Sequence, residues 1–100
     1  MKRIVVSLSK LDIETETTFR DLMGENGIAF WHRLPGIWLL STPDEFTFIQ
    51  IRDMVGDRLQ GVTMVVVEAE HAAVRVPLNQ REWFVKHWGV ANLTPVDKKD

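Results

Sequence analysis

The hydrophobic pattern of the chain switches several times between the period of a strand and that of a helix. Residues 3–9 are rich in β-branched side chains and alternate in facing, which predicts a strand. Two short strand-like runs, 28–34 and 37–41, are separated by a Pro-Gly pair, so we expect a β-hairpin. Residues 62–68 form a further β-branched run and predict a strand buried on both faces.

Two helices are predicted between these strands. Phe19, Leu22 and Met23 share one helical stripe, which predicts a helix over residues 12–25. A second helix is expected to begin at Thr42, where Thr-Pro-Asp-Glu has the composition of a capping box. It ends before Gly61.

The last third of the chain gives weaker signals. Residues 69–76 are expected to contain a turn and a brief strand. A second capping-box pattern at 79–82 predicts a last, aromatic helix that ends at Gly89. Residues 90–96 could form an extended strand, either within the chain or exchanged between subunits, and we expect residues 97–100 to be frayed.

This order of elements is typical of an α+β protein. It predicts a ferredoxin-like βαββαβ sandwich with an additional C-terminal helix, in a single domain over residues 1–96. The helix-free face of such a sheet would display apolar residues, so the last helix, a second subunit or a ligand should cover it. We favour a homodimer, with Val5, Trp83 and Trp88 as candidate interface residues.

Composition narrows the function classes. The 100 residues are 45% hydrophobic and 26% charged, an ordinary globular balance, and they include no cysteine. Disulfides, thiolate zinc sites and a cysteine nucleophile are therefore excluded. A net charge of −2 argues against a dedicated nucleic-acid binder. Neither a signal peptide nor a run of about 20 apolar residues is found, so we expect a soluble cytoplasmic protein with no membrane contact.

The hairpin carries the candidate binding residues. Trp31, His32 and Arg33 would suit a nucleotide, because aromatic faces beside a guanidinium bind single strands. The same residues could instead form cross-strand pairs with Trp38, and we favour this packing interpretation.

Signatures of catalysis are weak. The histidines have no spacing that suggests a shared site, although one could act as a general base. Glu68, Glu70 and His71 could supply metal ligands, but a solvated strand end is the favoured interpretation. No phosphate loop, nucleophile elbow or zinc-helix motif is present. We therefore predict no catalytic residue, no bound metal and no cofactor.

Several motifs resemble a known family. Its hallmarks are the hairpin sequences Trp31-His32 and Trp38–Thr42, a helix containing Ile51-Arg52-Asp53, the strand 62–68 and the helix 82–88. In these the chain resembles the short SinR-like proteins, stand-alone relatives of the small CRISPR-associated protein at the dimeric centre of the spacer-acquisition complex. The resemblance covers most of residues 3–88 and implies a ferredoxin-like homodimer.

The resemblance also implies a possible activity. Some CRISPR-associated members are described as metal-dependent nucleases, and related toxins as ribonucleases. Their first strand ends in a Tyr-Asp pair whose aspartate would hold the metal. Here the matching positions are Val6-Ser7 or Leu8-Ser9, which offer no carboxylate.

Three functions remain in view. The first is a homodimeric, non-catalytic module that binds nucleic acid or a protein partner. The alternative is a ribonuclease or metal-dependent nuclease of the CRISPR-associated or toxin-like kind. A second alternative is a small-molecule-binding dimer, supported by fold analogy.

Overall fold

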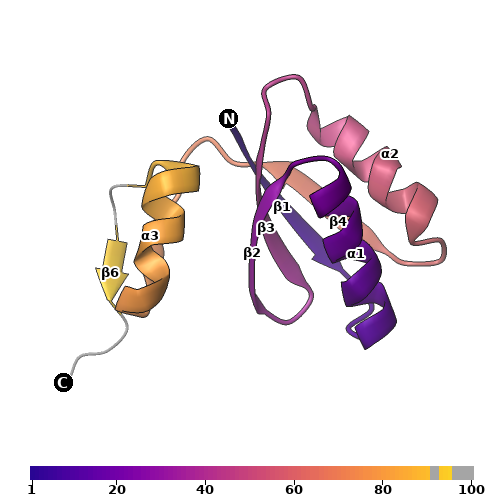
Figure 1. Ribbon diagram of the computed structural model, residues 1–100, viewed down its shortest axis with the longest axis horizontal. Helices are drawn as coiled ribbons and strands as arrows, with labels where there is room; N and C mark the ends of the chain where they lie inside the picture. The colour runs from indigo at the N-terminus through magenta and orange to yellow at the C-terminus, as the bar shows by residue number, and fades with distance from the viewer. Residues whose placement is uncertain (91–92, 96–100) are drawn as a thin grey trace.

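The chain folds as a ferredoxin-like α+β domain, as the order of elements predicts. A computed structural model describes residues 1–90 and 93–95. Four strands form an antiparallel sheet in the order β2-β3-β1-β4; α1 and α2 lie on one side of it and the C-terminal helix on the other (Figure 1). The elements are β1 (Lys2–Leu8), α1 (Ile13–Glu25), β2 (Ala29–Leu34), β3 (Ile37–Thr42), α2 (Phe48–Arg58), β4 (Met64–Glu68), β5 (Val74–Val76), η1 (Leu78–Gln80), α3 (Arg81–Trp83), η2 (Phe84–Trp88) and β6 (Leu93–Pro95).

Strand β1 organises the sheet because it pairs on both sides. Val5 lies opposite Leu39 of β3 and opposite Val67 of β4. Directly opposed residues of antiparallel strands point to the same face, so these three side chains share the face away from α1 and α2. The β2–β3 turn is held against the same strand, since the Leu8 N–H donates to the Gly36 carbonyl at 2.7 Å.

The main core fills the space between the sheet and helices α1 and α2. Trp38 and Phe19 lie at its centre with their ring centroids 4.3 Å apart, and both are almost fully buried. Each large apolar side chain buried in this way stabilises the fold by about 1.5–3 kcal/mol. The other buried members include Ile4, Val6, Leu22, Met23, Leu40, Ile51 and Val55.

A second apolar cluster lies on the opposite face and joins the C-terminal helix to the sheet. Its buried residues are Trp31, Val76, Phe84, Trp88 and Val90, with Val5 and Leu39 packed against them. Three long-range hydrogen bonds fix the helix in place. The Trp88 Nε1–H donates to the Leu40 carbonyl at 2.9 Å, Ser41 Oγ donates to the His87 carbonyl at 2.9 Å, and Arg3 Nε donates to the Trp88 carbonyl at 2.8 Å. The last helix therefore covers part of the apolar face of the sheet opposite α1 and α2, as one of the three expected alternatives.

The predicted start of the second helix is wrong by several residues. Helix α2 begins at Phe48, and its capping box is formed by Thr47 and Gln50. Thr42 instead ends β3, where it pairs with Lys2 of β1. The buried Thr42 hydroxyl has no hydrogen-bond partner among the residues described. Strand pairing extends the backbone at Thr42 and so overrides the local capping signal.

Two further expectations are corrected at the end of the chain. The run predicted to be buried on both faces is the edge strand β4, and its Val65 and Val67 are 59% and 47% exposed. The capping box predicted at 79–82 is a 3₁₀ turn without a side-chain cap. The Gln80 side chain accepts a hydrogen bond from Trp31 Nε1 instead.

The aromatic helix itself is confirmed. It runs through α3 and continues as a π-helical turn, η2, before Gly89 ends it with a positive φ of 59°. Strand β6 pairs in parallel with β5, so the strand expected within residues 90–96 forms in part, and within its own chain. The frayed tail predicted at 97–100 lies outside the described residues. Among the described residues, no helix is long and apolar enough to cross a membrane.

The two threonines give a matched test of the helix start. Thr47→Ala removes the cap of α2 and is expected to lower the free energy of unfolding by about 1 kcal/mol. Thr42→Val replaces a buried hydroxyl that has no partner in the described structure, so we expect no loss. Urea unfolding of both variants measures the difference. Equal losses, or a larger loss for Thr42→Val, would contradict this assignment.

Candidate ligand-binding groove at the edge of the sheet

A groove of about 450 Å³ lies along the edge strand β2, between α1 on one side and the C-terminal helix on the other. Its lining combines cations with aromatic rings. Arg20 of α1, Arg33 of β2 and Lys86 of η2 supply the cations. The rings come from Phe30, Trp31 and Trp83.

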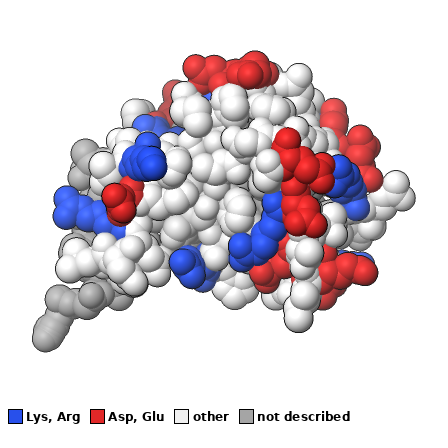
Figure 2. Space-filling model, viewed as in Figure 1, with Lys and Arg blue, Asp and Glu red and all other residues white. Residues whose placement is uncertain are grey.

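The charge of the groove differs in sign from that of the whole chain. Among the described residues, three cations and two histidines line it against the carboxylate of Glu82, and Glu16 of α1, outside the lining, pairs with Arg20 at 3.6 Å. In Figure 2 acidic side chains gather mainly along the upper and right-hand parts of the molecule, while the central surface is uncharged and is bordered by both basic and acidic side chains. A locally positive surface on an acidic chain favours an anionic ligand at this place.

His32 is the most constrained polar group of the groove. Its ring stacks on Trp38 with centroids 3.7 Å apart and an interplanar angle of 3°, and its side chain is only 9% exposed. Nδ1 lies 2.9 Å from the carbonyl oxygen of Ile37. Because a carbonyl oxygen can only accept, Nδ1 must carry a proton and Nε2 faces the α1 side.

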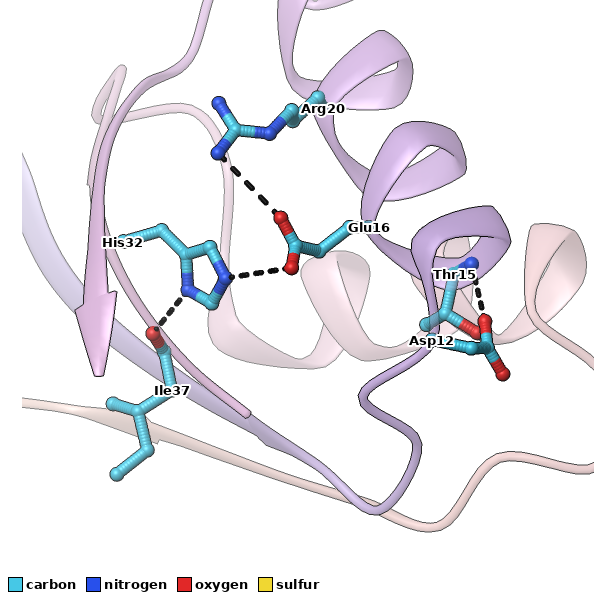
Figure 3. Close-up of polar contacts among 6 residues, drawn as sticks. All are labelled: Asp12, Thr15, Glu16, Arg20, His32 and Ile37. Carbon is cyan, nitrogen blue, oxygen red and sulfur yellow. Dashed lines mark hydrogen bonds and ion pairs between the residues drawn. The ribbon is translucent and has the colours of Figure 1, made fainter. Parts of the chain in front are cut away.

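Helix α1 supplies the groups that face His32 (Figure 3). Glu16 Oε2 lies 3.6 Å from His32 Nε2, and Glu16 Oε1 lies 3.6 Å from the Arg20 guanidinium. The guanidinium carbon of Arg20 also lies 5.3 Å from the centroid of the Phe30 ring and 5.5 Å from that of Trp38, within cation–π range. Arg20 is therefore positioned by both a carboxylate and aromatic rings.

Asp12 caps the N-terminus of α1 and so sets the position of the first turns, which carry Glu16. The Thr15 backbone N–H donates to Asp12 Oδ1 at 2.7 Å. Hydrogen bonding to the Thr15 side chain, and next to its backbone N–H, holds the pKa of the Asp12 carboxyl below its ordinary value of 3.8, because both stabilise the ionised form. The carboxylate at the N-terminus of α1 thus caps the helix at neutral pH.

A second hollow of about 400 Å³ lies on the other side of His32 and is lined by the β2–β3 turn and α1. Arg20, His32 and Arg33 line both hollows. An anionic chain that crosses the edge of the sheet would therefore meet the same cations from either side, with the Glu16 carboxylate beside Arg20 in the second hollow.

The structure brings Trp31, His32 and Arg33 to one groove but does not turn them to one face. Trp31 packs on the side covered by the C-terminal helix, where its ring lies 5.2 Å from that of Phe84. His32 packs on the opposite side against Trp38, and Arg33 is exposed. Neighbouring strand residues point to opposite faces, which explains the division.

Sequence reasoning did not assign Arg20, Lys86 or His87 to a binding site, although all three line the groove. His32 and His87 both line it although they lie 55 positions apart, on a strand and a helix. Lys86 also joins them from the C-terminal helix. No local spacing signals this arrangement, because the docking of the helix on the sheet creates it.

The described residues form neither the metal site considered at Glu68, Glu70 and His71 nor the metal site of the resembling family. Glu68, Glu70 and His71 are exposed, and within residues 1–90 and 93–95 no three potential metal ligands come together. Of the positions matched to the family aspartate, Ser7 is exposed on the helix-free face, and Ser9 Oγ accepts a hydrogen bond from the Thr63 N–H at 3.0 Å.

The candidate interface residues make internal contacts. Trp88 is 5% exposed and belongs to the second apolar cluster, against which Val5 and Trp83 are packed. Trp83 is only partly buried, and its ring centroid lies 5.2 Å from that of His87 at the rim of the groove. These contacts leave part of the Trp83 ring open to a ligand.

Comparison with known proteins supports the fold. No family model matches the chain, and no curated protein sequence matches it. Among solved structures it is similar to part of a formyltetrahydrofolate deformylase from Pseudomonas putida KT2440, with a TM-score of 0.50 and 15% identity over 96% of this chain. The chain spans 41% of that protein's length. At this identity the likeness supports the ferredoxin-like fold alone.

The tautomer of His32 is open to direct measurement. We expect ¹⁵N NMR at pH 8 to find the proton of the neutral ring on Nδ1, because the Ile37 carbonyl requires a donor there. Exposed His71 provides an internal reference. A His32 ring protonated on Nε2 alone would contradict the geometry of this side of the groove.

Proposed function

We propose that this ferredoxin-like domain is a non-catalytic binding module that takes single-stranded nucleic acid in the groove along β2. The observation that carries the proposal is the meeting of Arg20, Arg33 and Lys86 with partly exposed aromatic rings in one groove. Sequence-tolerant recognition of single strands uses this combination of backbone-tracking cations and stacking platforms.

Each component of the groove has a role in such binding. Arg33 and Lys86 are exposed on opposite walls, β2 and η2, and would contact phosphates. Trp83 offers a ring face on which an unpaired base would stack. Bases in a duplex have no free face of this kind, so a single strand is favoured over a double strand.

A ribonuclease is the second candidate, favoured by one observation. His32 and His87 line the same groove, and a neutral histidine can act as a general base. Against this, the His32 ring is stacked on Trp38 and nine-tenths buried, which restricts its approach to a substrate hydroxyl. The binding function therefore ranks first.

A homodimer is also part of the proposal. The C-terminal helix leaves Val65 and Val67 exposed on β4, an edge strand. An exposed apolar edge strand is a ready template for pairing with a second copy. We also propose that the chain is related to the SinR-like proteins, because its hairpin and helix motifs resemble theirs. Such a relationship would account for a dimer.

Binding to labelled oligonucleotides tests the groove. At low salt, we expect fluorescence anisotropy to detect binding of single-stranded RNA and DNA in preference to the matched duplexes. Arg33→Ala and Lys86→Ala should each weaken binding for all sequences and lower the slope of log K against log salt by about 0.7, because each removes one phosphate contact.

Arg52→Ala provides the matched control, because Arg52 is exposed on α2, away from the groove. An equal effect of Arg52→Ala would reject the groove as the site. The same mixtures run on a gel with magnesium, manganese or chelator would reveal cleavage. Cleavage that is lost in a His32→Asn variant would favour the ribonuclease over the binding module.

Sedimentation tests the dimer. We expect the wild-type chain to sediment as a dimer at micromolar concentration. Val67→Lys should shift it to monomer, because a charge on the β4 edge opposes pairing. Val85→Lys, at a similarly exposed valine on the C-terminal helix, should leave the dimer intact. A monomeric wild-type chain would overturn this part of the proposal.

A further inference from the structure

A separate pocket of about 390 Å³ opens between the C-terminal helix and the face of the sheet on which it docks. Val5, Leu34 and Leu39 of the sheet line it with partly or fully exposed side chains, and the buried rings of Trp31, Phe84 and Trp88 complete the lining. The segment that follows β4, residues 69–76, borders the pocket on the remaining side. The pocket shares only Trp31 with the groove along β2.

Arg3 holds the two borders of the pocket in place. Its Nε donates to the Trp88 carbonyl at 2.8 Å, and its Nη1 donates to the Glu70 carbonyl. The Ala69 N–H donates in turn to the Arg3 carbonyl at 2.8 Å. One side chain thus ties the 69–76 segment and the C-terminal helix to β1, so the pocket is formed before any ligand binds.

The size of the pocket follows from small side chains on one border. Ala69, Ala72 and Ala73 line it, where larger residues would fill the space. Its volume lies near the lower end of the roughly 300–1,000 Å³ found for ligand pockets. The ligand that fits is therefore small.

The charges at the pocket are of one sign. Among residues 1–90 and 93–95, the ionisable residues that line it are His71 and Arg75, both basic and exposed, and no carboxylate of this part of the chain lines it. The remaining lining is apolar or aromatic. A ligand complementary to this arrangement has an apolar body and one anionic group at the pocket mouth.

We propose that this pocket binds a small monocarboxylic acid with an aromatic or aliphatic body. The body packs against Val5, Leu34 and Leu39, whose side chains are open to the pocket, and the carboxylate accepts hydrogen bonds from the Arg75 guanidinium. This site is independent of nucleic-acid binding, because Arg75 and the alanines of the 69–76 segment do not line the groove.

Calorimetry with paired probes tests the proposal on the full chain. The acids are 4-phenylbutyrate, 2-naphthylacetate and octanoate, and 4-phenylbutan-1-ol is the neutral counterpart of the first. We expect saturable binding of at least one acid, with 4-phenylbutyrate about 10-fold tighter than its alcohol, since a charge-assisted hydrogen bond adds about 1.5 kcal/mol. Arg75→Gln should remove that preference and leave binding of the alcohol unchanged.

Two further variants test whether the acids bind in this pocket. Ala73→Phe, at an exposed position in the lining, should fill the pocket and weaken binding of acid and alcohol alike. Arg52→Gln, on α2, should change neither. Absence of saturable binding for all three acids, or equal affinities for acid and alcohol, would overturn the proposal. A dimer that dissociates in Ala73→Phe would assign the pocket to a second copy instead and would overturn it as well.

Discussion

The docking of the aromatic C-terminal helix on the open face of the sheet is the contact on which the other features depend. A four-stranded sheet with α1 and α2 on one side leaves its second face apolar, and water contact with that face is costly. Trp88 reduces this cost through two contacts with the sheet. Its ring joins the second apolar cluster, and its Nε1–H satisfies the Leu40 carbonyl within the sheet. Burial of the ring therefore leaves its polar atom satisfied.

The groove along β2 and the apolar pocket both follow from the partial reach of this helix. The helix is short, ending at Gly89, so it covers only part of the face (Figure 1). On its outer side it faces α1 across the edge strand β2, which creates the basic groove. On its inner side it faces the 69–76 segment across Val5 and Leu39, which creates the apolar pocket. What remains uncovered is the β4 edge with Val65 and Val67.

Local sequence signals were reliable where tertiary structure agreed with them. The alternation in residues 3–9 and the helical stripe of α1 predicted their elements because each buries one face in the main core. The predictions failed where pairing overruled a local motif. Thr42 has good capping chemistry, but pairing with Lys2 keeps it in β3. The valines of β4 have the composition of a doubly buried strand, yet β4 lies at an edge, and neither position nor burial is encoded in composition.

The candidate site was harder to predict than the fold for a related reason. Trp31, His32 and Arg33 are adjacent in sequence, but strand geometry sends the rings of Trp31 and His32 to opposite cores. The partners that complete the groove, Lys86 and His87, come from a helix whose position depends on long-range hydrogen bonds. The net charge gave no sign of the cations in the groove, because it is a sum over the whole chain and the fold places acidic and basic residues on different surfaces.

Segregation of charge gives this small chain a way to bind an anion despite its net charge of −2. At physiological ionic strength a charge is screened over about 8 Å, so a ligand in the groove responds chiefly to charges near it. There it would meet Arg20, Arg33 and Lys86, with Glu82 the one carboxylate among the described residues of the lining. The overall negative charge slows the approach of a polyanion from a distance, whereas the local cations stabilise it once it has arrived. An acidic module of this kind should therefore release its ligand readily as salt rises, which suits a reversible binding role better than permanent association.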